Sequence, residues 1–234
     1  MEELNIPSLD IEDFDMDDAA AASVDEIEEG GGRIAKAFFD LGYRKTVAIN
    51  TAKSDLALLD LPDGHKFHLD CFGQQGAGKN QEKSKEAFEL KGQEIFNKLR
   101  EVFGEKIDRI LICVGAAGGT GGGSVLPLVD IAKRYFTYVG KEDVSERVGV
   151  IASLPTSGEC ASPVVATNAY NRIQSLCASA ANGDFAPLIM IDNDKIKKLY
   201  PKLTVKKFWP TLNNTIAGLF HVFNLLATKN ISTE

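Results

Sequence analysis

The stretch from 109 to 124, R-I-L-I-C-V-G-A-A-G-G-T-G-G-G-S, constrains the fold of this chain more than any other. Residues 110–114 are all apolar and mostly branched, which predicts a strand buried on both faces of a parallel sheet. Six of the nine residues from Gly115 to Gly123 are glycine, and an amphipathic run that predicts a helix begins at about Ser124. The predicted order is therefore strand, glycine loop, helix.

The glycine loop has the chemistry of an anion site. Glycine allows tight turns with positive φ and lets a ligand approach the backbone closely. The first amides of the following helix have no acceptor inside the helix, and the helix dipole favours negative charge there. Loop and helix start together predict a cradle for nucleotide phosphates, to which Thr120 can add a hydroxyl donor. The alternative is a glycine-rich turn that only links two elements.

The composition is that of an ordinary globular protein, with 44% hydrophobic and 25% charged residues among 234. Because no apolar run reaches membrane-spanning length and the N-terminus is acidic, we expect a cytoplasmic protein with no membrane partner. The four cysteines show no paired spacing, so we expect reduced thiols. His65 and His68 have no third ligand nearby, so no metal site is predicted.

Charge is distributed unevenly along the chain. Residues 1–29 hold twelve Asp or Glu and no Lys or Arg, whereas the rest holds 26 basic and 21 acidic residues. We therefore expect an acidic, disordered leader over 1–29 before a mildly basic body. Nothing in this pattern directly indicates a nucleic-acid partner.

Strands and helices are predicted to alternate after the leader. The expected strands are 46–50, 66–70 at an edge, 110–114, 148–153 and 187–191, and the expected helices are 34–41, 80–102, 124–132, 164–180 and 205–226. Because proline is tolerated only near a helix start, the last helix should begin close to Phe208, just before Pro210. The pattern predicts an α/β fold of three layers, a parallel sheet with helices on both faces.

We expect a nucleotide-binding domain over 30–203 and a long central helix over 204–234. Ligands of such sheets bind at the carboxyl ends of the strands. Asn50, 115–120, 155–159 and 192–194 all lie at such ends, so one ligand could contact all of them.

A second phosphate-loop interpretation rests on 73–80, which reads G-x-x-x-x-G-K-N. It is one residue from the P-loop pattern, whose last position is a magnesium-binding Ser or Thr. The strand before it is short and half polar, unlike the buried strand that a P-loop needs. A dinucleotide fold is disfavoured because Gly119-x-Gly121 lacks the final spaced glycine.

The order of the motifs matches one family better. The run G-A-A-G-G-T-G-G-G at 115–123 resembles the G-G-G-T-G-[ST]-G loop of the tubulin/FtsZ family. Other stretches follow in the family's order: 30–33 resembles its first glycine loop, 48–51 the strand end A-x-N-T, 76–80 the G-A-G-x-x-P stretch over the γ-phosphate, 153–155 the next strand end, 193–194 the N-D that meets guanine, and 213–214 the base-reading part of the central helix.

The resemblance implies a GTP or GDP site, with Mg²⁺ as an ion that could accompany the nucleotide. The implied binding residues are Gly31, Gly32, Arg33, Asn50, Gly76, Ala77, Gly78, Gly115, Ala116, Ala117, Gly118, Gly119, Thr120, Gly121, Pro155, Glu159, Asn193, Asn213 and Asn214. Asparagine amides offer both the donor and the acceptor that guanine requires. The resemblance implies that Asn193 and one of Asn213 or Asn214 read the base, and that Glu159 approaches the ribose.

Ordinary structural roles remain open for the same side chains. The asparagines could cap helices or face solvent, Asn50 could form a turn, and Glu159 could be a carboxylate favoured by a helix start. Two loop positions also depart from the family pattern, because Ala117 replaces a glycine and Gly122 a hydroxyl residue.

The strand expected before the first glycine loop is a further departure. Residues 23–29 read S-V-D-E-I-E-E, and burying four carboxylates in a central strand is costly. We therefore expect this strand to be absent or degenerate.

In the family, an acidic loop after the central helix enters the next subunit's nucleotide site and positions the attacking water. The chain ends at Glu234 without such a loop, so we expect the nucleotide-binding half of the fold, with the second domain absent and no catalytic residue. By resemblance, the complete protein would form head-to-tail filaments and hydrolyse GTP at subunit contacts, while this chain alone turns over little. A catalytically silent assembly or regulatory tubulin-like protein is the alternative.

Overall fold

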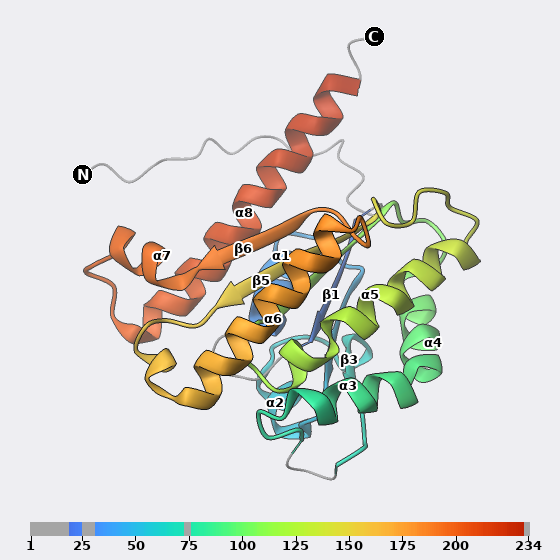
Figure 1. Cartoon of the computed structure of the whole chain (residues 1–234). Coiled ribbons are helices and arrows are strands. Elements are labelled where there is room, and N and C mark those ends of the chain that lie inside the picture. The colour runs from blue at the N-terminus through green and yellow to red at the C-terminus, as the bar shows by residue number, and fades with distance from the viewer. Residues whose placement is uncertain (1–18, 25–30, 73–75, 232–234) are drawn as a thin grey trace.

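The computed structural model describes residues 19–24, 31–72 and 76–231. Within these residues, a parallel sheet has the strand order β3-β2-β1-β4-β5-β6 (Figure 1). The strands are β1 (Ala19–Val24), β2 (Thr46–Asn50), β3 (Lys66–His68), β4 (Arg109–Gly115), β5 (Val148–Leu154) and β6 (Leu188–Asp192). The predicted three-layer α/β fold is confirmed.

Helices cover both faces of this sheet (Figure 1). They are α1 (Gly31–Asp40), α2 (Lys53–Leu58), α3 (Gln81–Leu90), α4 (Gly92–Phe103), α5 (Thr120–Tyr138), α6 (Pro163–Ala181), α7 (Asn193–Leu199) and α8 (Val205–Ile231), with short 3-10 turns η2 (Asp63–His65) and η4 (Glu159–Ala161). Helices α3 to α6 lie on one face, and α1 and α8 lie on the other.

Strand β4 belongs to both cores because its side chains alternate between the two faces. Ile112 and Val114 are fully buried in the larger core with helices α3 to α6. Cys113 points the other way and packs with Phe38 of α1 and Leu212 of α8. A strand buried on both faces reads as a continuous apolar run, as the sequence of β4 predicted.

The strand before the first glycine loop is present, although the sequence led us to expect it absent or degenerate, and it lies before most of the 23–29 stretch considered for it. It is β1 (Ala19–Val24), which pairs with β2 on one side and β4 on the other. The expectation of a disordered leader over 1–29 is therefore wrong for residues 19–24, while 1–18 and 25–29 lie outside the described residues. Its sequence A-A-A-A-S-V has weak β propensity, so only pairing with two neighbours reveals it.

Three helix boundaries also differ from the predictions. Helix α5 begins at Thr120 instead of about Ser124, and the expected helix over 80–102 divides into α3 and α4 around Lys91. Helix α8 begins at Val205 and contains Pro210. Phe208 and Leu212 pack into the core on either side of Pro210. This packing lets the helix include the proline, which helix propensity alone would place near a helix start.

Candidate functional site

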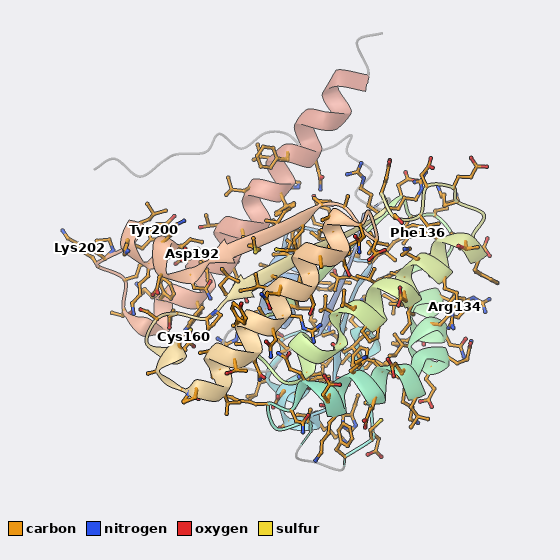
Figure 2. All side chains as sticks on the ribbon, viewed as in Figure 1. Arg134, Phe136, Cys160, Asp192, Tyr200 and Lys202 are labelled. Carbon is orange, nitrogen blue, oxygen red and sulfur yellow. The ribbon has the colours of Figure 1, made fainter. Side chains whose placement is uncertain are left out.

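The carboxyl ends of the strands meet at one edge of the sheet. Gly115 is in register with Ser153, and Leu154 is in register with Asp192. Figure 2 shows Asp192 and Cys160 on the side of the molecule where β5 and β6 end, whereas Phe136 near the end of α5 lies far from them. The structure therefore brings the ends of β2, β4, β5 and β6 together, as the sequence predicted.

The glycine loop after β4 is a tight turn. The Ala116 amide donates to the Ser153 carbonyl at 3.0 Å, and the Gly118 amide donates to the Gly115 carbonyl at 3.3 Å. Helix α5 then starts at Thr120, and its first amides have no acceptor within the helix. The Thr120 hydroxyl is buried and lies 2.8 Å from the Thr51 hydroxyl, so it also ties the loop to the end of β2.

The second glycine loop lies against the same place. Gly76 and Gly78 have φ of 64° and 58°, a region that favours glycine. The Ala77 amide donates to the Thr51 hydroxyl at 3.1 Å, which joins this loop to the one after β4. Asn80 then caps α3 by accepting from the Lys83 amide at 3.1 Å.

The first glycine cluster forms the start of α1. Gly31 and Gly32 are its first two residues, both buried, and Arg33 is half-buried. A Cβ atom at Gly31 would overlap the carbonyl of Cys113, so the helix start lies directly against β4. Two helix N-termini, those of α1 and α5, therefore flank the end of this strand, and both favour an anion there.

Asn193 is the most informative side chain at the edge. It is the first residue of α7, whose cap is Asp192, and only 1% of it is exposed. Neither Nδ2 nor Oδ1 has a hydrogen-bond partner among the described residues. A buried amide without partners is costly, and its donor and acceptor are both available to a bound group.

The two candidate asparagines of α8 differ in burial. Asn213 is 7% exposed, whereas Asn214 is exposed to solvent. Asn213 follows Leu212, which packs with α1 in the smaller core. Of the two, Asn213 is therefore the one turned toward the rest of the protein.

Polar contacts already hold the segment after β5. Following Pro155, the Thr156 amide and hydroxyl donate to the Glu159 carboxylate at 2.6 and 2.7 Å. The Ser157 amide donates to Asp194 at 2.7 Å, and this bond lowers the pKa of that carboxyl. The turns after β5 and β6 are thus joined, and Glu159 has the local role that its position near a helix start allows.

Asn50 also has a local role. Its side-chain oxygen accepts from the Ala52 amide at 2.9 Å, which forms the turn after β2. A nucleotide role for Asn50 or Glu159 remains a prediction.

The sequence analysis missed the residues that support the glycine loop. Gln81 and Ser84 of α3, with Asn168 and Arg172 of α6, contact the loop or one another. The sequence held one indication of the role of Gln81: it stands where the G-A-G-x-x-P pattern has proline.

Within the described ranges, no group of three or more His, Cys, Asp or Glu side chains could hold a metal ion. No described helix has both the length and the apolar character needed to cross a membrane.

The fold and this edge define a three-layer α/β domain with glycine loops at the carboxyl ends of its parallel strands. No family model matches the chain. In sequence, the chain is 25% identical over 192 residues to the tubulin-like protein TubZ of Bacillus cereus, an alignment that covers 79% of this chain and 41% of that protein. It is 29% identical over 137 residues to TubZ of Clostridium botulinum C phage, covering 54% and 37% respectively.

The solved structures agree with the sequence relatives. CetZ2 from Haloferax volcanii, solved as a GTPγS-bound protofilament, matches with a TM-score of 0.67 at 20% identity, covering 87% of this chain and 57% of that one. Clostridium botulinum phage c-st TubZ matches with a TM-score of 0.60 at 21% identity, covering 88% and 58%. The resemblance to the tubulin/FtsZ family, of the prokaryotic and phage type, is confirmed. The chain spans less than half the length of these curated relatives.

Proposed function

We propose that this chain is the guanine-nucleotide-binding part of a filament-forming GTPase. The observation that carries the proposal is the buried Asn193 amide, which has no hydrogen-bond partner among the described residues at the edge where the glycine loops meet. Guanine presents an acceptor at O6 and donors at N1 and N2, which match the two ends of an asparagine amide.

The residues present fit a nucleoside di- or triphosphate. The starts of α1 and α5 would hold the phosphates on backbone amides, and the second glycine loop at 76–78 would lie over the terminal phosphate. Asn193 and Asn213 would read the base, and Mg²⁺ would accompany the phosphates as their counterion. The relatives support this assignment, since CetZ1 was solved with GDP and CetZ2 with GTPγS.

We extend the proposal to assembly and turnover of the whole protein. Bacillus thuringiensis TubZ was solved as protofilaments in GTPγS and GDP forms, which supports head-to-tail association here. Such a contact is open-ended, as a filament requires. Hydrolysis would be completed by an acidic loop of the neighbouring subunit, so this chain alone should bind GTP with little turnover. Sustained turnover by the isolated chain would contradict that part of the proposal.

Substitutions in the glycine loop test the phosphate site. Gly118→Leu and Gly119→Leu should abolish GDP binding, measured by calorimetry, because a side chain would fill the space that the phosphates need. Under the P-loop alternative, Lys79→Ala should abolish binding, whereas under our proposal it should only weaken it. Lys85→Ala on the exposed side of α3 is the matched control.

A further inference from the structure

Gln81 reaches from the first turn of α3 to the back of the glycine loop. Its Nε2 donates to the carbonyls of Ala116 and Gly118, each at 3.0 Å. One side-chain amide therefore spans the tightest part of the turn and fixes the direction of two of its peptide planes.

Asn168 of α6 completes this contact from a second helix. Its Nδ2 donates to the Ala117 carbonyl at 3.3 Å and to the Lys79 carbonyl at 2.9 Å. Three successive loop carbonyls, 116 to 118, thus face side chains of α3 and α6. Because N–H and C=O point in opposite directions across a trans peptide, the amides of Ala117 and Gly119 face the other side of the loop.

Gly122 makes room for Gln81. A Cβ atom at position 122 would overlap Nε2 of Gln81 and lie 2.9 Å from the Ala116 carbonyl. The resembled family pattern has a hydroxyl residue at 122 and a proline at 81, so two of the departures from it fall on one pair of contacting residues. Together they replace a local side chain of the loop with an amide from α3.

Arg172 of α6 fixes the orientation of this amide. Its Nη2 donates to Oε1 of Gln81 at 3.3 Å, which leaves Nε2 of Gln81 for the loop carbonyls. The guanidinium lies largely inside the protein, where burial lowers its pKa, and its Nε has no acceptor among the residues that the structure describes. Its Nη2 thus holds the neutral Oε1 of Gln81 in place, while the nearby Glu82 carboxylate partly offsets the effect of burial on its pKa.

We propose that Gln81 is a positioning residue of the phosphate site, that Gly122 is its matched partner, and that the pair turns the loop amides toward the phosphates of a nucleoside di- or triphosphate. The inference rests on the proposed nucleotide site and deepens it. Gln81 contacts no phosphate itself, since it acts through the direction of the loop peptides.

The test is GDP affinity, measured by calorimetry on Gln81→Ala and on Gln81→Met, which fills the same space without a donor. Losing two hydrogen bonds behind the loop should weaken GDP binding by about tenfold. Affinity for guanosine, measured by competition against labelled GDP, should stay within about twofold because it lacks phosphates. The control is Gln93→Ala on the exposed face of α4, which should leave GDP affinity unchanged.

A double-mutant cycle tests the pairing. Gly122→Ala should weaken GDP binding in the parent chain and have a smaller effect in the Gln81→Ala background, because the side chain that it displaces is already gone. If the two substitutions had strictly additive effects on the free energy of GDP binding, Gln81 and Gly122 would not act as a pair.

Two results would overturn the positioning role. One is unchanged GDP affinity in both Gln81 variants, and the other is an equal loss for GDP and guanosine, which would indicate general damage to the fold. If the parent chain bound no GDP, the proposed function would fail and this inference with it. If the parent chain bound GDP and both Gln81 variants bound it equally well, only the positioning role of Gln81 would fail.

Discussion

At the phosphate end of the candidate site, side chains of the protein already donate hydrogen bonds to the loop carbonyls, whereas at the base end one buried side-chain amide has no partner among the described residues. The glycine loop carbonyls accept from Gln81 and Asn168, and Thr120 contacts Thr51. At the base end, both polar atoms of the buried Asn193 side chain have no partner within the described chain. Under the proposed function, the first end is organised before a ligand arrives, and the second would obtain its hydrogen bonds from the ligand.

The difference follows from the chemistry of the two ligand groups. Phosphates are bound by backbone amides, so the protein must fix the backbone, and side chains behind it do so. A base is read by side-chain amides, which must remain available for it. Substitutions should therefore differ at the two ends: loss of both stability and affinity at the first, and loss of affinity alone at the second.

The largest effect is expected at Gly31. Gly31→Ala places a Cβ on the Cys113 carbonyl, so α1 must move away from β4. We expect a loss of about 3 kcal/mol or more in the free energy of unfolding, measured in denaturant, together with loss of GDP binding. Gly64→Ala is the control, since its Cβ would meet nothing within 4 Å. Equal stability of the two variants would contradict the close contact of α1 with β4.

At the base end, Asn193→Leu should separate affinity from stability. Removing a buried amide without partners should leave the ligand-free protein as stable as the parent or slightly more so. GDP should bind about 10- to 100-fold more weakly, since the base loses a donor and an acceptor. Denaturant unfolding and calorimetry measure the two quantities, and Asn171→Leu on exposed α6 is the control. If Asn193→Leu lowered the stability of the protein and left GDP affinity unchanged, Asn193 would be a structural residue and not a base-reading one.

A pH series addresses how α8, which carries Asn213, is attached to Tyr43 in the turn after α1. The Tyr43 hydroxyl lies 3.1 Å from His221 Nδ1 and accepts from Asn224 at 3.0 Å. Burial lowers the pKa of His221 from its usual 6.5, so the unfolded chain takes up the proton first as pH falls. Stability should therefore decrease as pH falls through about 6.5 toward the lower folded value.

Thermal unfolding at pH 7.5 and 5.5 measures this effect. The melting temperature of the parent should fall by more than that of His221→Gln, whose amide can still form a hydrogen bond with Tyr43 but does not titrate in this range. Identical pH dependence of the two proteins would exclude His221 as the source.

The smallest effects on stability are expected at the helix caps, where the phosphate end and the base end of the candidate site should behave alike. Asp192 accepts from the Lys195 amide at 2.9 Å, and Asn80 accepts from the Lys83 amide at 3.1 Å. Replacing either by alanine should cost about 1 kcal/mol of unfolding free energy. Asp192→Asn keeps a capping oxygen, so its loss of unfolding free energy should be only a few tenths of the loss in the alanine variant. An equal loss in the two variants would show that the charge of Asp192, and not its capping hydrogen bond, stabilises α7.

Much of the fold could be predicted because its signals are local. The apolar run of β4, the glycines after it and the periodicity of the helices indicate a parallel three-layer sheet. Strand β1 could not be located, because alanine carries little β propensity and only pairing with β2 and β4 selects it. The start of α5 was missed for a related reason: Gly122 and Gly123 weaken helix propensity, but a side chain at either would collide with Gln81.

The candidate site divides in the same way. The glycine loops and Asn193 could be recognised from spacing and resemblance. The supporting side chains Gln81, Asn168 and Arg172 could not, because they come from helices that only the tertiary fold brings to the loop. Nor could sequence distinguish Asn213 from Asn214, since only the packing of α8 buries one and exposes the other.

Competition binding tests the central claim most directly. The chain is mixed with a fluorescent guanosine diphosphate, and unlabelled GTP, GDP and ATP are titrated against it. The proposed guanine site predicts that GTP and GDP displace the probe and that ATP does not, with the unpaired Asn193 amide pairing with the guanine base. Displacement by ATP as effective as that by GTP, or no binding of the probe, would contradict it.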